Sequence, residues 1–340
     1  MKPIEKISAD CDVKVRSDRI GRYFKRYLEK FVFGEFSDEY MLKVGVFDIM
    51  RDVPVPLRKG DLEIFRGGDG VPALHLAENM TWIMGADPHF EFVPNYVDFL
   101  KKLFNYKIYE GMLKKGRDAA EKGNLNKACI YFRATLCMNP TYLHGMYSYA
   151  RVCRAMYLKS DNEEYTGRFK AEAMDYFELT TEAHPRFAQA YYYLGYAYLN
   201  MGLYLKAELA WKGFLKLSQN MHDRKEIKER LLQIEDPILI EQGCNMVLSG
   251  KYNEGLQALE PFFETKYSSW WPLSYYLGVC FGRLGLEEKA LESFKNVLTL
   301  NPGHLETIEE LGAIYELRGD SENEEKYKKK AEIIRKRLTQ

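Results

Sequence analysis

A pattern of glycine and aromatic residues that returns at a fixed interval is the feature that most limits the fold of this chain. Four positions of one copy reappear in the next copy with the same spacing: Leu277, Gly278, Phe281 and Gly285 return as Leu311, Gly312, Tyr315 and Gly319. A fixed period, here about 34 residues, is typical of chains built from stacked copies of one small unit, in which each copy contacts only its neighbours. The fold of the chain is therefore set by the unit.

Within a copy, three more positions follow the first glycine at fixed offsets: Ala290, Phe294 and Pro302 lie 12, 16 and 24 residues after Gly278. Other copies keep this frame, and their matched residues are Gly116, Gly123, Ala128, Phe132 and Pro140; Ala150, Ala173, Phe177 and Pro185; Leu194, Gly195, Tyr198, Gly202, Ala207 and Trp211; and Gly243, Gly250, Gly255 and Leu259. Insertions near residues 157–168 and 221–235 stretch the frame. The pattern predicts about six units over residues 109–340.

Apolar residues on both sides of Gly285 recur at helical spacing, which predicts two amphipathic helices per unit. Glycine ends the first helix because it adopts the left-handed conformation at little cost. Pro302 stops the second helix because it has no backbone N–H to continue it. Gly278 and Ala290 are small where the two helices must approach closely, and Phe294 fills the space beside them. Each pair alone leaves an apolar face open, so neighbouring pairs must stack.

These residues at these offsets resemble the tetratricopeptide repeat, a helix-turn-helix unit of about 34 residues. The resemblance covers residues 109–340, roughly two thirds of the chain, and it implies an all-α fold, an α-solenoid of helix-turn-helix repeats. Three departures are local. Most first helices lack the family's tryptophan, Gly255 replaces its alanine, and Glu324 and Lys328 stand where alanine and phenylalanine are due. The polar residues of the last unit predict a C-terminal capping helix.

Residues 1–108 do not follow the period and are predicted to form a mainly helical N-terminal region, of no assigned family, packed on the first repeat. Four stretches have a helical pattern, the first two preceded by the capping residues Ser17 and Ser37: 20–31, 38–51, 73–85 and 94–106. The prolines and glycines of 52–73 predict a loop, with a short extended piece at Leu62–Phe65.

Bulk composition favours an ordinary globular protein, because Lys+Arg and Asp+Glu both number 49 and 46% of residues are hydrophobic. The N-terminal stretch has no apolar core of a signal peptide, and no run of residues is long and apolar enough for a membrane helix. The six cysteines are scattered without a CxxC pair. These features predict a cytoplasmic protein that is not inserted in a membrane.

The sequence shows no catalytic motif, which predicts that the chain is not an enzyme and needs no cofactor. GxSxG, HExxH and GxxxxGK[ST] are absent, and the glycines of 67–70 do not open a predicted helix after a strand. One local cluster of potential metal ligands exists, with the residues His75, Glu78, Asp87, His89 and Glu91. It lacks an i, i+4 histidine pair or paired cysteines, so a helix end and a turn are the favoured interpretation and no metal site is predicted.

A ligand of a tetratricopeptide-like array is expected in the concave groove lined by the first helices of the units. The second, fifth, ninth and twelfth residues of each unit point away from the positions that the motif uses for packing. Those positions and their neighbours predict a binding groove formed by Arg117, His144, Tyr147, Arg151, Arg154, Tyr192, Tyr196, Asn200, Tyr275 and Arg283. An alternative for each tyrosine is that it packs between neighbouring first helices.

Tyrosine and arginine are residues that anchor interfaces, and arginine binds carboxylates with two hydrogen bonds. The chain is therefore predicted to be a non-catalytic scaffold that holds a protein or peptide segment with acidic and apolar side chains. Leu113 and Arg117 do not match the carboxylate clamp with which some family members bind chaperone C-termini. The alternative is a peptide-sensing regulator with a nucleic-acid-binding N-terminal region. Residues 1–35 carry a charge of only +3, which does not favour nucleic acid.

Overall fold

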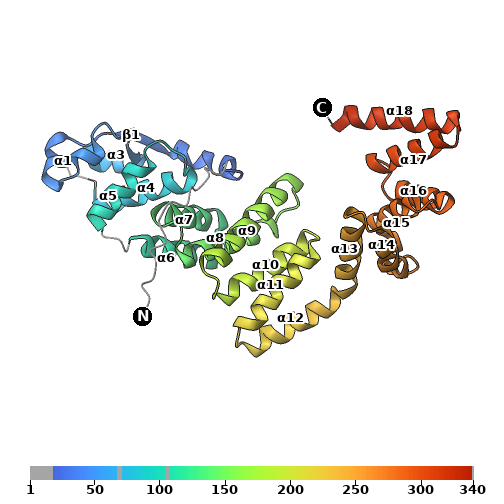
Figure 1. Ribbon diagram of the computed structural model, residues 1–340. Helices are drawn as coiled ribbons and strands as arrows, with labels where there is room; N and C mark the ends of the chain where they lie inside the picture. Colours follow the sequence, from blue (N-terminus) through green and yellow to red (C-terminus); the bar gives the residue numbers. More distant parts are fainter. Residues whose placement is uncertain (1–17, 67–70, 105–107, 339–340) are drawn as a thin grey trace, which may run out of the picture. The chain divides into compact units, whose positions relative to one another are not determined.

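The computed structural model describes residues 18–66, 71–104 and 108–338, and most of them are helical (Figure 1). In chain order the elements are the 3-10 helices η1 (Gly21–Tyr23) and η2 (Lys25–Lys30), β1 (Phe31–Gly34), α1 (Asp38–Val44), α2 (Phe47–Met50), β2 (Val55–Arg58), α3 (Lys59–Arg66), α4 (Ala73–Ala86), α5 (Val93–Phe104), α6 (Ile108–Glu121), α7 (Leu125–Met138), α8 (Leu143–Tyr157), α9 (Glu163–Ala183), α10 (Ala188–Asn200), α11 (Tyr204–Leu217), α12 (Met221–Gln233), α13 (Glu235–Leu248), α14 (Tyr252–Leu259), η3 (Glu260–Phe262), η4 (Lys266–Ser269), α15 (Trp271–Arg283), α16 (Glu287–Leu300), α17 (Leu305–Leu317) and α18 (Ser321–Leu338).

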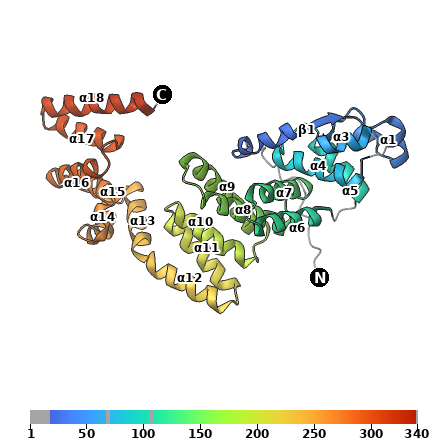
Figure 2. The ribbon, with the colours of Figure 1, turned by 180° about the vertical axis from the view of Figure 1, so that it is seen from behind.

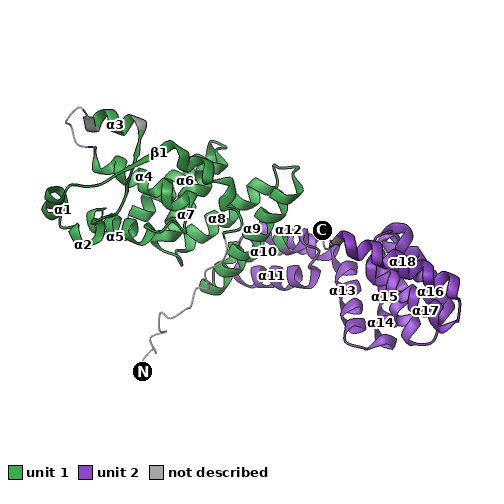
Figure 3. Ribbon diagram, turned by 90° about the horizontal axis from the view of Figure 1, so that it is seen from above, with its two compact units in different colours: residues 1–197 green, residues 198–340 purple. Residues whose placement is uncertain are grey.

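The chain divides into two compact units, residues 1–197 and 198–340 (Figure 3). The first contains the N-terminal region and the helix pairs α6–α7 and α8–α9. The second contains the pairs α13–α14, α15–α16 and α17–α18, and α10 crosses the boundary between the units. The all-α fold of repeated helix pairs is confirmed. The domain boundary predicted at residue 108 falls inside the first unit and stays a prediction.

The turn inside a helix pair has the same construction in five places. Glycine with a φ of 68° to 77° follows the first helix at Gly123, Gly202, Gly250, Gly285 and Gly319. The residue after each glycine donates its N–H to the carbonyl five residues earlier, over 2.8 to 3.0 Å. This bond satisfies a carbonyl that the end of the helix leaves free. The role predicted for the second glycine of the period is therefore confirmed.

The first glycine of the period allows close helix packing, as predicted. A Cβ atom on Gly278 would lie 2.7 Å from the ring of Phe294, and one on Gly116 would lie 2.5 Å from the ring of Phe132. Phe294 is 1% exposed and Phe132 is 2% exposed. The aromatic ring of the second helix thus occupies the space that a side chain on the first helix would need.

Gly255 stands where the tetratricopeptide pattern has alanine, and the side chain of Val247 occupies the space that a methyl group would need. Its Cβ would lie 2.6 Å from Cγ2 of Val247 on α13. The matching positions in the next pair are Gly282 and Ala290, where the glycine lies on the first helix and the methyl group on the second, with 3.9 Å between the added Cβ and that methyl group. The two pairs therefore place the small residue on opposite sides of the same contact.

We expect Gly255→Ala to lower the free energy of unfolding by about 1–2 kcal/mol, because overpacking outweighs the better helix propensity of alanine. Adding Val247→Ala should relieve the clash, so the double variant should be no less stable than Val247→Ala alone. Chemical denaturation of the three variants measures this coupling. Strictly additive losses would show that the two residues do not share one space.

The last helix pair has a buried apolar core although polar residues stand at two of its motif positions. Lys328 stands at the position due for phenylalanine, but Tyr327 replaces the missing ring, 9% exposed and stacked on Tyr315 with 5.6 Å between ring centroids. Ala331 is also buried in this core. The outer face of α18 is charged, so the helix closes the core on one side and meets water on the other. A helix is present at 321–338, and its role as a capping helix stays a prediction.

The N-terminal region contains more than the predicted helices. Residues 20–31 form η1, η2 and the start of β1 instead of one α-helix, and Gly45, with a φ of 70°, separates α1 from α2. Phe31–Gly34 pairs antiparallel with Val55–Arg58. Leu62–Phe65 is helical, so the extended piece was predicted at the wrong place in this loop. Ser37 caps α1 as predicted, whereas Ser17 lies outside the described residues.

The N-terminal region shares one hydrophobic core with the first helix pair. α4 packs against α7 (Figure 2), and a Cβ on Gly85 would lie 2.0 Å from the carbonyl oxygen of Ile130. Met112 and Met138 belong to the same cluster of buried residues as Tyr96 and Phe99. This core covers the first repeat on the side where an array of repeats would otherwise end in water.

Candidate protein-binding site

Arg151 and Arg154 on α8 lie over the ring of Tyr193 on α10. The guanidinium carbons are 5.2 Å and 5.5 Å from the centroid of that ring, and Arg151 is also 5.6 Å from the centroid of Tyr147. The two arginines are three residues apart, so they emerge from one face of α8. Stacking on tyrosine orients a guanidinium and leaves its N–H groups directed outward along the plane.

Neither arginine of this pair has a carboxylate partner among the described residues. Arg151 is exposed, and the Nε of Arg154 is buried without a hydrogen-bond partner. Other arginines of the first unit differ: Arg19 pairs with Asp175 over 2.7 Å, and Arg133 pairs with Asp18. A buried donor without a partner costs free energy, so the Arg154 Nε–H is not stabilised by any acceptor in the described part of the chain.

Tyr147 packs between helices, which is the alternative interpretation of the predicted tyrosines. Its ring centroid lies 5.0 Å from that of Phe187 and 5.9 Å from that of Tyr193, both in edge or tilted contact. Tyr193 in turn stacks on Phe177 at 5.7 Å with an interplanar angle of 11°. Burial raises the pKa of Tyr147 to about 12, so its hydroxyl stays protonated at neutral pH. Tyr147 is half-buried, and the guanidinium of Arg151 lies over its ring.

Two other predicted tyrosines adjoin this cluster on α10. The ring of Tyr192 lies 5.0 Å from that of Tyr193 and 5.2 Å from that of Tyr196. Both Tyr192 and Tyr196 are half-buried, and Asn200 is exposed at the end of the same helix. The structure thus brings five of the predicted residues together: Tyr147, Arg151, Arg154, Tyr192 and Tyr196. We call these five residues and Tyr193 the Arg–Tyr cluster.

Four of the other predicted residues are not members of the Arg–Tyr cluster. Arg117 and His144 are exposed on α6 and α8, and no ring contact or ion pair joins them to the cluster in the described part of the chain. Tyr275 and Arg283 belong to the second compact unit. There Arg283 forms an ion pair with Glu310 over 3.2 Å, so a carboxylate already neutralises its charge.

The main residue that the sequence interpretation missed is Tyr193. It occupies a position between the predicted Tyr192 and Tyr196, on the side of α10 that was assigned to packing. Its role as the platform for both arginines depends on the packing of α8 against α10. The run Tyr191-Tyr192-Tyr193 was the one signal available in the sequence.

His304 caps the start of α17, at the junction between two helix pairs. Its Nδ1 accepts a hydrogen bond from the N–H of Thr307 at 3.3 Å, at the start of α17, and its ring lies 4.4 Å from that of Trp271 and 4.9 Å from that of Tyr275. Burial lowers the pKa of His304, and the nearby Glu306 opposes this effect in part. The cap requires an unprotonated Nδ1.

We therefore expect stability to fall when the pH drops below 6.5, the ordinary pKa of histidine, toward the lower value of folded His304. In that window the unfolded chain binds the proton and the folded chain does not. His304→Asn keeps a capping side chain but does not titrate in this range. Urea unfolding between pH 7 and 5 should show a smaller loss for the variant than for the wild type. Equal losses would contradict this role for His304.

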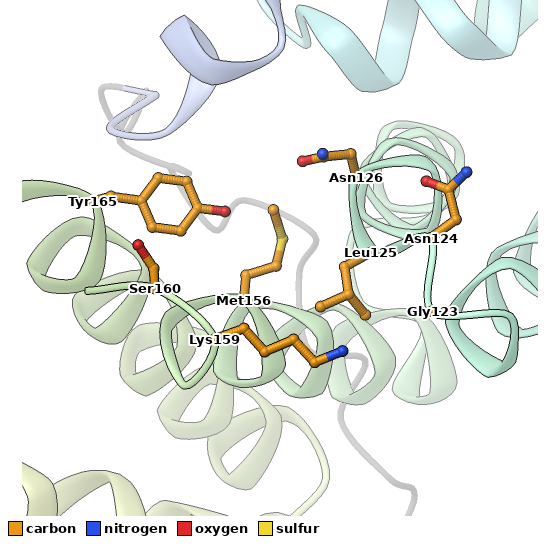
Figure 4. Close-up of a pocket in the computed structure, with 8 residues that line it drawn as sticks. All are labelled: Gly123, Asn124, Leu125, Asn126, Met156, Lys159, Ser160 and Tyr165. Carbon is orange, nitrogen blue, oxygen red and sulfur yellow. The ribbon is translucent and has the colours of Figure 1, made fainter. Parts of the chain in front are cut away.

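The first unit has two hollows besides the Arg–Tyr cluster. One, of about 370 Å³, lies between the α6–α7 turn and the end of α8, where Asn126, Lys159 and the hydroxyl of Tyr165 border it (Figure 4). The other, of about 400 Å³, is bordered by lysines of α6 and α7.

Within 18–66, 71–104 and 108–338 no three His, Cys, Asp or Glu side chains are placed to hold a metal ion, so the potential ligands between His75 and Glu91 do not come together. None of the described helices has the length and apolar character to span a membrane.

Comparisons with known proteins find similar structures only. No family model and no curated protein matches the chain. The tetratricopeptide domain of P58(IPK) matches 66% of this chain and 59% of its own, at 22% identity and a TM-score of 0.40. A tetratricopeptide repeat protein from Parabacteroides merdae matches 81% of this chain and 91% of its own, at 15% identity and a TM-score of 0.32. A thermophilic tetratricopeptide repeat protein from Thermus thermophilus matches 75% of this chain and 94% of its own, at 14% identity and a TM-score of 0.29.

The assignment of the repeats depends on the chain's own packing. Five helix pairs are joined by the same glycine turn, and in three of them a glycine on the first helix faces a large apolar side chain on the second at the expected offset. In fold, this chain is an all-α array of helix-turn-helix units that resemble the tetratricopeptide repeat.

Proposed function

We propose that the chain is a non-catalytic scaffold that binds a protein or peptide segment at the Arg–Tyr cluster, on the face formed by the first helices. The observation that supports this most is the exposed guanidinium of Arg151, which lies over the rings of Tyr147 and Tyr193 and has no carboxylate partner among the described residues. Arg154 lies over the same Tyr193 ring. A carboxylate on a bound segment would neutralise this positive charge.

The chemistry of the cluster specifies the segment. Two arginines stacked on tyrosine favour a planar carboxylate, because the guanidinium N–H groups match its two oxygens. The half-buried rings of Tyr192 and Tyr196 next to them favour an apolar side chain. We therefore propose that the partner segment carries an aspartate or glutamate next to an apolar residue.

A displayed library of random peptides tests this proposal without a known partner. Peptides selected on the wild-type chain should be enriched in an acidic residue beside an apolar one. Arg151→Ala/Arg154→Ala should weaken their binding at least tenfold, because each lost charge-assisted hydrogen bond contributes about 1.5–3 kcal/mol. Arg151→Lys/Arg154→Lys should give an intermediate loss, because lysine keeps the charge but not the planar fork.

Lys43→Ala/Lys228→Ala is the matched control. Both lysines are exposed and without an ion pair among the described residues, and the variant removes the same charge away from the cluster. It should bind the selected peptides as the wild type does. Peptides that bind Arg151→Ala/Arg154→Ala with unchanged affinity would refute the proposal.

A further inference from the structure

Three aromatic rings form a row across the N-terminal region and the first helix pair. Tyr27 of η2, Trp82 of α4 and Tyr131 of α7 follow one another with centroid distances of 5.7 Å and 6.1 Å. Tyr27 and Trp82 are half-buried, so part of each ring meets water. The row shares no residue with the Arg–Tyr cluster. No period in the sequence would align these rings, because they come from three separate elements.

Every ring of this row has a cation over it. Arg26 and Lys30 lie 5.2 Å and 5.5 Å from the centroid of Tyr27. Arg58 lies 5.4 Å from that of Trp82, and Lys127 lies 5.8 Å from that of Tyr131. We call the three rings and these four cations the ring–cation row. None of the four cations has an ion pair among the described residues.

One end of the ring–cation row opens into the hollow of about 400 Å³. Its lining adds charged and polar groups: Glu78, Lys115, Asp118, Lys122, Asn124, Lys127 and Tyr131. Glu78 is already engaged, since it accepts hydrogen bonds from Tyr131 at 2.8 Å and Lys115 at 3.1 Å. Lys122 adds another cation without an ion pair among the described residues.

Carboxylates around the row do not cancel its charge. Glu29 is next to Lys30 in the chain, Asp61 accepts the backbone N–H of Arg58, and Glu78 and Asp118 line the hollow. These four carboxylates, set against six cations, leave two positive charges in excess; the cations are Arg26, Lys30, Arg58, Lys115, Lys122 and Lys127. Arg19 and Arg22, two other basic residues of this region, form ion pairs with Asp175 and Glu164 of α9. Their charge is therefore already neutralised, unlike that of the cations of the row.

We infer that the ring–cation row binds single-stranded nucleic acid. Proteins that bind single strands combine cations that follow the phosphates with aromatic side chains that stack on bases. Here Tyr27 and Trp82 each keep part of their ring in water, whereas Tyr131 is buried. The net charge of the chain is zero, so attraction of a polyanion must come from a local surface such as this one. An acidic peptide would use the cations but would not contact the exposed parts of the Tyr27 and Trp82 rings.

Fluorescence anisotropy of the full chain with labelled single-stranded RNA and DNA of about 12 nucleotides tests the inference. Binding should weaken as salt rises from about 50 to 200 mM, because phosphate contacts release counterions. Arg26→Ala/Lys127→Ala should lower the slope of log affinity against log salt by about 1.4, which is two phosphate contacts on a single strand. Lys43→Ala/Lys228→Ala removes the same charge from residues outside the row and should leave the slope unchanged.

Tyr27→Leu tests the stacking component, because leucine keeps the apolar contact but not the aromatic face. We expect at least a fivefold loss of affinity with little change in the salt slope, since stacking on one base contributes about 1–3 kcal/mol. Competition with polyglutamate identifies the class of ligand. The inference is overturned by absent binding at the low end of that salt range, by an equal loss in Lys43→Ala/Lys228→Ala, or by polyglutamate competing as well as the oligonucleotide.

Discussion

Replacement of Asp18 by alanine is expected to lower the free energy of unfolding by about 3–5 kcal/mol. Asp18 accepts a hydrogen bond from Arg133, whose side chain is 3% exposed in the middle of α7. Truncating one partner of a buried pair leaves the other charge in a low-dielectric site, which costs far more than the pair itself contributes. Chemical denaturation measures the loss, and its expected size is a large part of the stability of an ordinary domain.

The matched variant for this prediction is Asp18→Ala/Arg133→Met, which removes both charges and keeps the apolar stem. Replacing a buried ion pair with apolar residues of similar volume is often close to neutral. We therefore expect the double variant to recover most of the loss. If Asp18→Ala costs less than about 1 kcal/mol, the pair does not anchor the start of η1 to α7.

Phe294→Ala is expected to lower the free energy of unfolding of the second unit by about 3–5 kcal/mol, because it opens a cavity in the core of the α15–α16 pair. Phe294 is 1% exposed and its ring lies where a Cβ on Gly278 would be. Gly278→Ala alone should cost about 1–3 kcal/mol through overpacking. Thermal and chemical denaturation of each variant measure both effects.

The combination Gly278→Ala/Phe294→Ala should be more stable than the sum of the two losses predicts. The methyl group introduced by Gly278→Ala enters space that the ring has left, so the clash disappears and part of the cavity is filled. Additive losses would contradict the direct contact that defines this repeat. The first helix pair offers the same test with Gly116 and Phe132.

The sequence was sufficient to predict the helix pairs because each pair is held by contacts inside a single repeat unit. Gly285 ends a helix and Gly278 receives Phe294, and both effects are local to one unit. The N-terminal region offered no such period. Its hairpin joins Phe31–Gly34 to Val55–Arg58 through a segment with prolines, and two prolines there argued for a loop. Backbone pairing over this distance leaves little trace in a single sequence.

The candidate site was predicted only in part, for a physical reason. The helical spacing places Tyr147, Arg151 and Arg154 on one face of α8, and the structure brings them together. Tyr193 depends on how α10 packs against α8, which the offsets within a unit do not specify. The Asp18–Arg133 pair joins residues far apart in the sequence and is likewise set by tertiary packing.

Hydrogen exchange of the full chain, with and without a library-selected peptide, tests most directly whether a partner segment binds at the Arg–Tyr cluster. We predict slower exchange on binding in α8, residues 143–157, and in α10, residues 188–200, and no such change in Arg151→Ala/Arg154→Ala. Slower exchange confined to other helices, with α8 and α10 unchanged, would contradict it.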